Sequence, residues 1–223
     1  MTPFFRFPST PYLFLPANLE VREDKVLTAD ERSDLLSNPL HVEEKVDGEN
    51  LGISCDGDGL LFQARGSYVR PGGRHFRGLE TWIQSRGSRI ADALGTDLVL
   101  FGEWCTMVHS IHYDSLPDWM LVFDVYQHST GRFWETSRRD EFARDLGLHV
   151  VPLVATGRFS EQDLVNLIGK SRVGHALMEG VVARTQDSSG ARQRAKVVRP
   201  DFVQQIDNHW MSGIQSMNRL AVL

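Results

Sequence analysis

Short apolar runs recur along most of the chain. They lie at residues 42–46, 51–54, 60–64, 98–104, 120–126, 149–154, 180–184 and 194–198. Most are rich in Val, Leu, Ile and aromatic residues and are bounded by Gly, Pro or Asp, which is typical of β-strands. The sequence Asp-Gly-Asp-Gly at 56–59 predicts a tight hairpin turn between the second and third runs.

Helical patterns are mixed irregularly with these runs. Thr28-Ala-Asp-Glu31 matches a capping box and predicts a short helix through Leu36. Apolar positions between 79 and 94 predict helical faces that are interrupted at Gly87. Further helices are predicted from a Ser137 cap to Gly147, over 161–171 and over 202–217. This mixture, with its hairpin, predicts an α+β fold built on antiparallel sheets.

No repeat, low-complexity tract or linker divides the 223 residues. We expect a single domain over 1–223, with an N-terminal arm at 1–20, a C-terminal helix at 201–223 and no additional C-terminal domain. No apolar stretch is long enough to span a membrane, and the proline-broken start does not resemble a signal peptide. Cys55 and Cys105 give neither a disulfide framework nor metal-ligand spacing, so a cytoplasmic location is expected.

The formal net charge of -5 counts mildly against nucleic-acid binding. A local patch can still bind phosphate, and basic residues gather in two stretches. They are Arg65, Arg70, Arg74 and Arg77, followed by Arg192, Arg194, Lys196 and Arg199. Taken alone, these stretches fit a solvated surface as well as a binding site.

The segment Glu43-Glu44-Lys45-Val46-Asp47-Gly48-Glu49-Asn50 carries the clearest candidate chemistry. An apolar strand that ends in lysine and is followed by Asp-Gly places an amine at the edge of a sheet. Burial or nearby cations can lower the pKa of such a lysine and free its lone pair for attack. The motif by itself also fits a surface lysine before a turn, so it gains weight only from other motifs further along the chain.

Several short motifs come after it in order. They are Ala64-Arg65-Gly66-Ser67, Phe101-Gly102-Glu103-Trp104, Phe123-Asp124-Val125, Met178-Glu179-Gly180-Val181-Val182 and Arg194-Ala195-Lys196-Val197-Val198. The last places two cations on one face of a strand, because side chains alternate along it. Each motif alone could also be explained by residues that pack in the core or by charged residues at the edge of a strand. The complete set of motifs in this order would arise by chance far more rarely than any single motif.

This ordered set resembles the motifs of the covalent nucleotidyltransferases, which include ATP-dependent DNA ligases, RNA ligases and mRNA capping enzymes. The chain is most similar to the RNA ligase 2 type in Glu44-Lys45, Gly48 and Asn50, and in Pro152-Leu153 followed by Gly157-Arg158-Phe159. The resemblance spans roughly 45 to 202. It implies a nucleotidyltransferase (adenylation) domain of antiparallel sheets flanked by helices, an ATP-grasp-like ligase fold.

The resemblance also implies roles for individual residues. Lys45 is expected to attack the α-phosphorus of ATP and carry AMP covalently, while Arg194 and Lys196 neutralise charge on the phosphate. Glu179 and Glu103 are expected to hold Mg²⁺ or Mn²⁺ through carboxylate oxygens. Nucleotide contacts are implied for Glu44, Asp47, Gly48, Asn50, Arg65, Glu103 at the ribose, Phe123 and Val182 on either side of the adenine, and Lys196.

The implied reaction has three steps and serves RNA repair. The enzyme adenylates itself, passes AMP to the 5′-phosphate of an RNA end, and a 3′-hydroxyl then attacks and releases AMP. Asp47 stands where the RNA ligase 2 type usually has His, and Arg194 where it usually has Lys. Because few residues follow the last motif, we hypothesise an end-healing kinase or phosphatase partner that supplies binding surface.

Three other functions remain open from the sequence. A DNA ligase of the same superfamily would differ in its nick substrate. A capping-type guanylyltransferase would form lysine–GMP instead of lysine–AMP. A non-catalytic module that binds nucleic-acid ends would need no nucleophilic lysine, and the intact set of Lys45, Glu103, Glu179 and Lys196 argues against it.

Overall fold

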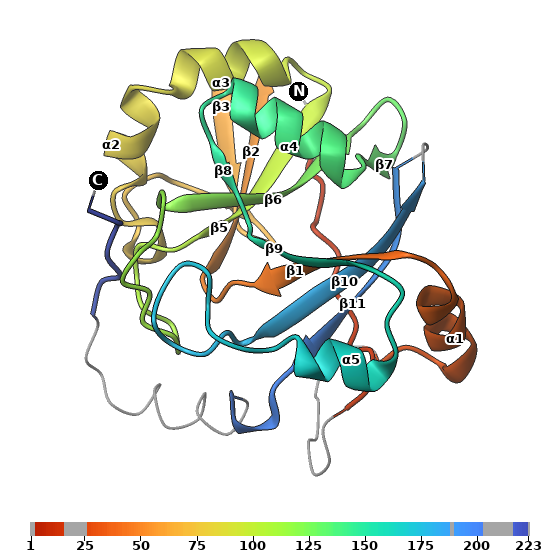
Figure 1. Ribbon diagram of the computed structural model, residues 1–223. Coiled ribbons are helices and arrows are strands. Elements are labelled where there is room, and N and C mark those ends of the chain that lie inside the picture. The colour runs from red at the N-terminus through yellow and green to blue at the C-terminus, as the bar shows by residue number, and fades with distance from the viewer. Residues whose placement is uncertain (1–2, 16–25, 188–189, 203–215, 223) are drawn as a thin grey trace. The chain divides into compact units, whose positions relative to one another are not determined.

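The computed structural model describes residues 3–15, 26–187, 190–202 and 216–222 (Figure 1). The described chain divides into two compact units, each with its own sheet and hydrophobic core. The first unit takes the N-terminal residues as far as Pro8, residues 48–107 and residues 117–150. The second unit takes the other described residues.

The first unit is built on a sheet with the strand order β4-β3-β2-β5-β6-β7, and β8 pairs in parallel with β6. Asp56 pairs with Gly59 at the predicted turn between β2 and β3. Gly59 has a φ of 135°, which glycine adopts at little cost. The strands are β2 (Glu49–Asp56), β3 (Gly59–Gln63), β4 (Tyr68–Val69), β5 (Leu98–Trp104), β6 (Met120–Gln127), β7 (Arg132–Phe133) and β8 (His149–Val150).

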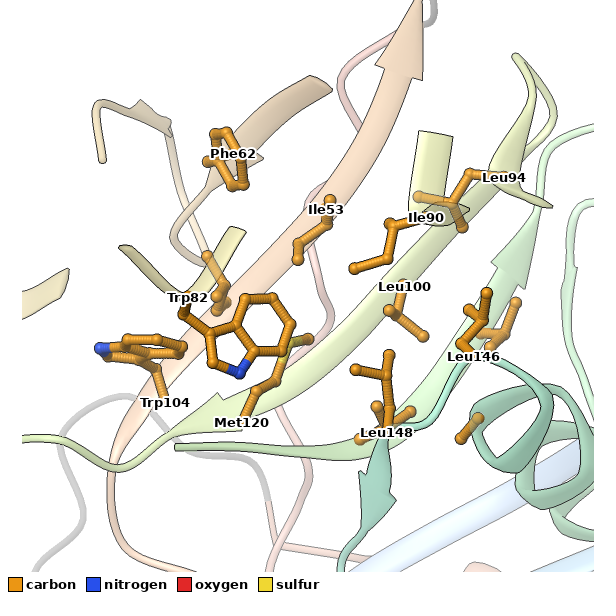
Figure 2. Close-up of a cluster of buried hydrophobic side chains, with 14 of the residues drawn as sticks. Ile53, Phe62, Trp82, Ile90, Leu94, Leu100, Trp104, Met120, Leu146 and Leu148 are labelled. Carbon is orange, nitrogen blue, oxygen red and sulfur yellow. The ribbon is translucent and has the colours of Figure 1, made fainter. Parts of the chain in front are cut away.

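Three helices cover one face of this sheet (Figure 1). They are α2 (Leu79–Gln84), α3 (Gly87–Leu94) and α4 (Thr136–Asp145), with a 3₁₀ turn η1 at Arg74–Phe76. Figure 2 shows Trp82 of α2 close to Trp104 and Met120 of the strands, and the two indole rings meet edge to face with centroids 5.7 Å apart. Because Trp104 is fully buried, this packing fixes the end of β5, where Glu103 lies.

The second unit is built on an antiparallel sheet with the strand order β11-β10-β1-β9. Leu35 and Leu164, from the two flanking helices, pack with Val42 and Val181 of the strands in its core. The elements are β1 (Leu40–Lys45), β9 (Leu153–Gly157), β10 (Gly180–Asp187) and β11 (Gly190–Val198), with α1 (Ala29–Ser37) and α5 (Glu161–Asn166).

The α+β class of antiparallel sheets flanked by helices is confirmed. The predicted capping box is present at α1, where the Thr28 side chain accepts from the Glu31 amide and the Glu31 carboxylate accepts from the Thr28 amide. The break predicted at Gly87 is also present, since α2 ends at Gln84 and α3 begins at Gly87.

Several predicted boundaries were wrong, and three of them changed the assignment of an element or its cap. Helix α4 begins at Thr136, and the Ser137 hydroxyl donates to the carboxylate of Glu135 instead of capping the helix. The single run predicted over 149–154 is divided between β8 and β9, which belong to different sheets. Pro152 lies at this division and has no amide to continue a strand ladder. Helix α5 ends at Asn166 and does not reach 171.

The two ends of the chain are described in part. Residues 3–15 contain no helix and form β-bridges through Tyr12. Residues 203–215 of the predicted C-terminal helix lie outside the described residues, whereas 216–222 are not helical and form a bridge between Leu116 and Leu220. The expectation of a single domain stays a prediction. In the part of the chain that the structure describes, no helix is long and apolar enough to cross a membrane.

Candidate active site

The two faces of strand β1 carry different side chains. Glu43 and Lys45 lie on one face, because side chains alternate along a strand. Val42 lies on the other face and packs into the core of the second unit. The antiparallel register pairs Lys45, the last residue of the strand, with Gly180 at the start of β10. The lysine therefore stands at the end of a strand, as the sequence predicts.

Lys45 forms an ion pair with Glu179, and its Nζ lies 2.7 Å from Glu179 Oε2. Glu179 comes immediately before β10, so the β1–β10 register brings the two residues together. The Lys45 side chain is 26% exposed and that of Glu179 is 8% exposed. Because the pair is mostly removed from water, removing either partner would leave a poorly solvated charge.

Burial raises the pKa of the Glu179 carboxyl to about 7. The Lys45 ammonium opposes this rise, the Asp47 carboxylate adds to it, and Lys196 lowers the pKa. A carboxyl group that titrates near neutral pH beside two lysines is typical of a functional site.

This pKa has a consequence for stability. We expect the free energy of unfolding of the wild type to fall, relative to that of Glu179→Gln, as the pH rises from about 5 to about 8. Up to about pH 7 the folded protein keeps a proton that the unfolded chain, with its ordinary pKa of 4.5, has released, and the difference levels off above this pH. The difference in the free energy of unfolding between the two proteins should change by about 1–3 kcal/mol. Urea unfolding of both proteins in a metal chelator measures it, and a constant difference over this range would contradict a raised pKa.

The two predicted cations of β11 share the face of the sheet that carries Lys45. The register pairs Lys196 with Val182 and Arg194 with Arg184 across β10, and paired residues project to the same side. Val182, which is expected to contact the adenine, therefore lies beside Lys196 on this face.

Tyr12 of the N-terminal segment lies against Lys196. The Lys196 ammonium lies 4.0 Å from the centroid of the Tyr12 ring, which is a cation–π contact. Backbone hydrogen bonds join the same two segments: the Lys196 amide donates to the Pro11 carbonyl, and the Leu13 amide donates to the Lys196 carbonyl. The N-terminal segment thus holds both the backbone and the side chain of a predicted catalytic residue.

A second ion pair is buried on the same face. Arg184 Nη2 lies 2.9 Å from Glu43 Oε2, with the side chains 4% and 1% exposed, and His41 Nε2 lies 3.4 Å from Glu43 Oε1. Glu43 pairs across the strands with Val182. This polar layer therefore adjoins the predicted adenine contact, and it must stay paired because both charges lack solvent.

Glu44 lies on the opposite face from Lys45. The Ser171 hydroxyl donates to Glu44 Oε1 at 2.6 Å and the Arg172 amide donates to Oε2 at 2.8 Å. Burial raises the pKa of the Glu44 carboxyl, and these two hydrogen bonds lower it. The structure does not bring Glu44 together with Lys45 and Lys196, so its implied nucleotide contact stays a prediction.

Asp47 is held by a loop that is far away in the sequence. Its Oδ2 accepts from the Ser110 amide at 2.7 Å and from the Ile111 amide at 3.0 Å. Its own amide donates to the Tyr113 hydroxyl at 2.8 Å. The turn that follows Lys45 is therefore fixed through both the backbone and the side chain of Asp47.

Gly48, Asn50 and Glu103 lie together in the first unit. The Gly48 amide donates to Glu103 Oε1 at 3.0 Å. A Cβ on Gly48 would lie 2.7 Å from the carbonyl oxygen of Trp104, which is too close, so this position requires glycine. Asn50 pairs with Glu103 across the sheet, and its buried Oδ1 has no hydrogen-bond partner within the described ranges. A buried acceptor of this kind is suited to a donor from a ligand.

Phe123 and Arg65 are also in the first unit. The half-buried Phe123 ring packs edge-on against Phe7, with centroids 5.1 Å apart. Arg65 follows β3 and is exposed. Phe7 thus supports the ring that is predicted to stack on the adenine.

The structure places the predicted residues in two sets. Glu179, Val182, Arg194 and Lys196 accompany Lys45 in the second unit, and Gly48, Asn50, Arg65, Glu103 and Phe123 belong to the first. Sequence reasoning gave no role to Tyr12, Glu43 or Arg184, although Glu43 opens the segment that contains Lys45. Strand alternation could have identified Glu43, which lies two residues before Lys45. No local signal marks Tyr12, because it reaches Lys196 through the fold.

The fold of antiparallel sheets flanked by helices matches the nucleotidyltransferase-type fold of RNA ligase structures. The chain belongs to the RNA ligase family, whose model matches residues 38–198. This range includes all the predicted catalytic, nucleotide-binding and metal-binding residues. A comparison with curated proteins gives no match.

The chain is similar to structures of a Naegleria gruberi RNA ligase. Its structure with PPi has a TM-score of 0.62 and 16% identity, over 79% of this chain and 55% of that chain. A lysine-to-alanine mutant with ATP and Mn has a TM-score of 0.60 and 12% identity, over 79% and 53%. A lysine-to-methionine mutant with AMP and Mn has a TM-score of 0.58 and 13% identity, over 77% and 53%. The chain therefore spans about half the length of these ligases. At this low sequence identity, the structural similarity shows that the fold is shared.

Proposed function

We propose that this chain is an ATP-dependent RNA ligase that seals 5′-phosphate and 3′-hydroxyl RNA ends in RNA repair, through AMP bound covalently to Lys45. The observation that carries the proposal is the ion pair of Lys45 with Glu179, on the sheet face that also bears Lys196, in a chain of the RNA ligase family. This arrangement provides a nucleophile and cations for one phosphoryl centre.

The proposed first step is the transfer of AMP to Lys45. After Lys45 loses its ammonium proton, the neutral amine attacks the α-phosphorus of ATP. A nitrogen–phosphorus bond forms, the bond to pyrophosphate breaks, and the nitrogen releases one further proton to solvent. Lys196 and Arg194 neutralise the charge that develops on the phosphate oxygens. The other predicted contacts are to the nucleoside, from Asn50, Glu103, Phe123 and Val182, and to a phosphate, from Arg65. The ATP, AMP and PPi bound in the Naegleria gruberi structures support these ligands.

The carboxylates suit a divalent cation. Glu179 offers a hard oxygen ligand, and the burial that raises its pKa to about 7 makes a neighbouring cation favourable for its ionised form. Glu179 would hold Mg²⁺ or Mn²⁺, which would supply charge neutralisation to the phosphates, and Glu103 stays a predicted metal ligand from the family resemblance. Mn in the relative's structures supports this choice. The two later steps, AMP transfer to the 5′-phosphate and attack by the 3′-hydroxyl, would use the same cations.

Labelling with nucleotide tests the proposed function. We expect label from α-³²P-ATP with Mg²⁺ or Mn²⁺, but not from α-³²P-GTP, to remain on the protein in a denaturing gel. A 5′-phosphorylated RNA nick should then be sealed faster than the same nick in DNA. Label from GTP would indicate a capping-type enzyme, and faster sealing of DNA a DNA ligase. No label on folded protein that mass spectrometry shows to be free of AMP would indicate a non-catalytic end-binding module.

A further inference from the structure

The segment 216–221 pairs with the loop 108–116, although about a hundred residues separate them in the sequence. Four backbone hydrogen bonds of 2.8–3.1 Å join the two segments. They run from the Val108 amide to Ser216, from Leu116 to Arg219, from Arg219 to Tyr113 and from Ala221 to Leu116. The loop is therefore held by a segment that lies beyond all the motifs of the proposed reaction.

Two buried side chains extend this pairing toward Lys45. The Tyr113 amide donates to Asn218 Oδ1 at 2.8 Å, and Asn218 is only 3% exposed. The Tyr113 ring is fully buried, and its hydroxyl oxygen accepts from the Asp47 amide at 2.8 Å. A hydrogen-bonded path thus leads from Asn218 through Tyr113 to the backbone two residues after Lys45.

The same loop also holds the side chain of Asp47. Its carboxylate accepts from the amides of Ser110 and Ile111. Asp47 is bound at both its amide and its carboxylate, so the turn after Lys45 has little freedom to move. The position of a nucleophile matters strongly, because a displacement of about 1 Å can cost about a hundredfold in rate.

We propose that Tyr113 and Asn218 are positioning residues that hold the Lys45 turn in place for attack on the nucleotide. The inference rests on the proposed function, since it assigns these residues to the adenylation step. Neither residue touches the nucleotide in this proposal: Asn218 orients Tyr113, and the Tyr113 hydroxyl holds the Asp47 amide. The C-terminal segment thereby contributes to the first step of the reaction.

The hydroxyl of Tyr113 can be removed without changing the ring. For Tyr113→Phe, we expect the single-turnover rate of Lys45 adenylation to fall about tenfold to a hundredfold, with little change in the ATP concentration that gives half the maximal rate. Joining of RNA that already carries 5′-adenylate should keep its wild-type rate, because Lys45 does not attack in that step. Tyr68→Phe is the matched control, since Tyr68 is 46% exposed and lies on β4.

A second pair of variants tests the link to the C-terminal segment. Asn218→Leu removes the acceptor for the Tyr113 amide and should reproduce the selective loss of the adenylation rate. Asn218→Asp keeps an oxygen at this position and should recover most of the rate. Thermal unfolding of every variant shows whether a loss arises from misfolding.

The outcomes separate this inference from the proposed function. Wild-type protein that takes no label from ATP contradicts the proposed function itself. If the wild type is labelled, an unchanged adenylation rate in Tyr113→Phe overturns the positioning role. Equal losses in adenylation and in the joining of adenylated RNA, for both Tyr113→Phe and Asn218→Leu, also overturn it, because they indicate a structural role alone.

Discussion

Lys45→Ala is expected to abolish covalent labelling from α-³²P-ATP, with a loss of at least about a thousandfold. The substitution removes the only proposed nucleophile, and the proposal gives Lys196, Arg194 and the nucleotide contacts no nucleophilic role. Glu179 loses its ion-pair partner in this variant. Because the pKa of Glu179 is about 7, protonation can neutralise the buried carboxyl, so the protein should still fold at slightly acidic pH.

The matched control for this experiment is Lys170→Ala. Lys170 is an exposed lysine of the same unit and should be replaceable without loss of label. Peptide mapping of the labelled wild type should place AMP on Lys45. Label that survives in Lys45→Ala and maps to another residue would show that the nucleophile has been assigned wrongly. Joining of RNA that already carries 5′-adenylate should continue in Lys45→Ala, because that step needs no lysine adduct.

Gly180→Ala is expected to destabilise the protein by about 3 kcal/mol or more. A Cβ at Gly180 would lie 2.0 Å from the carbonyl oxygen of Val197 and 2.9 Å from Val198 Cα. These are backbone atoms of β11, so a side-chain rotation cannot relieve the contact and the strands must separate. Gly180 is also the partner of Lys45 in the β1–β10 ladder, so separation of the strands should reduce labelling as well.

Urea unfolding of Gly180→Ala beside Gly169→Ala measures this effect. Gly169 belongs to the same unit, and a Cβ there would meet no atom of the described chain within 4 Å. We expect Gly169→Ala to change the free energy of unfolding by no more than about 0.5 kcal/mol. Equal stabilities for the two variants would show that β10 and β11 are not packed as closely as the structure has them at Gly180.

Local patterns in the sequence predicted most of the elements that carry the site. Strand β5 has its predicted bounds, Leu98–Trp104, because its apolar run begins after Asp97 and fills a core. The Thr28 capping box and the end of β1 at Lys45 were predicted for the same reason, since each depends on neighbours within a few residues. The prediction that Ser137 caps α4 was wrong. Several polar residues adjoin the start of this helix, and propensity alone does not decide which of them is the N-cap.

The tertiary structure decided what each polar residue contacts. Glu44 and Glu179 are both carboxylates beside a candidate motif, yet one binds Ser171 and Arg172 while the other binds Lys45. Strand register and pairing determine this difference, and both involve residues more than a hundred positions away.

Local sequence patterns could not predict the residues that support Lys196 and the turn after Lys45, for the same reason. Tyr12 reaches Lys196, and Asn218 reaches Tyr113, across long separations in the chain. A periodic pattern shows which side of an element is apolar, but it carries no information on which distant segment packs there. The order of the motifs was therefore enough to propose Lys45 as the nucleophile, which stays a prediction, and to indicate the family, which is confirmed. Only the packed structure, in which distant backbone groups must find hydrogen-bond partners, revealed what holds that lysine in place.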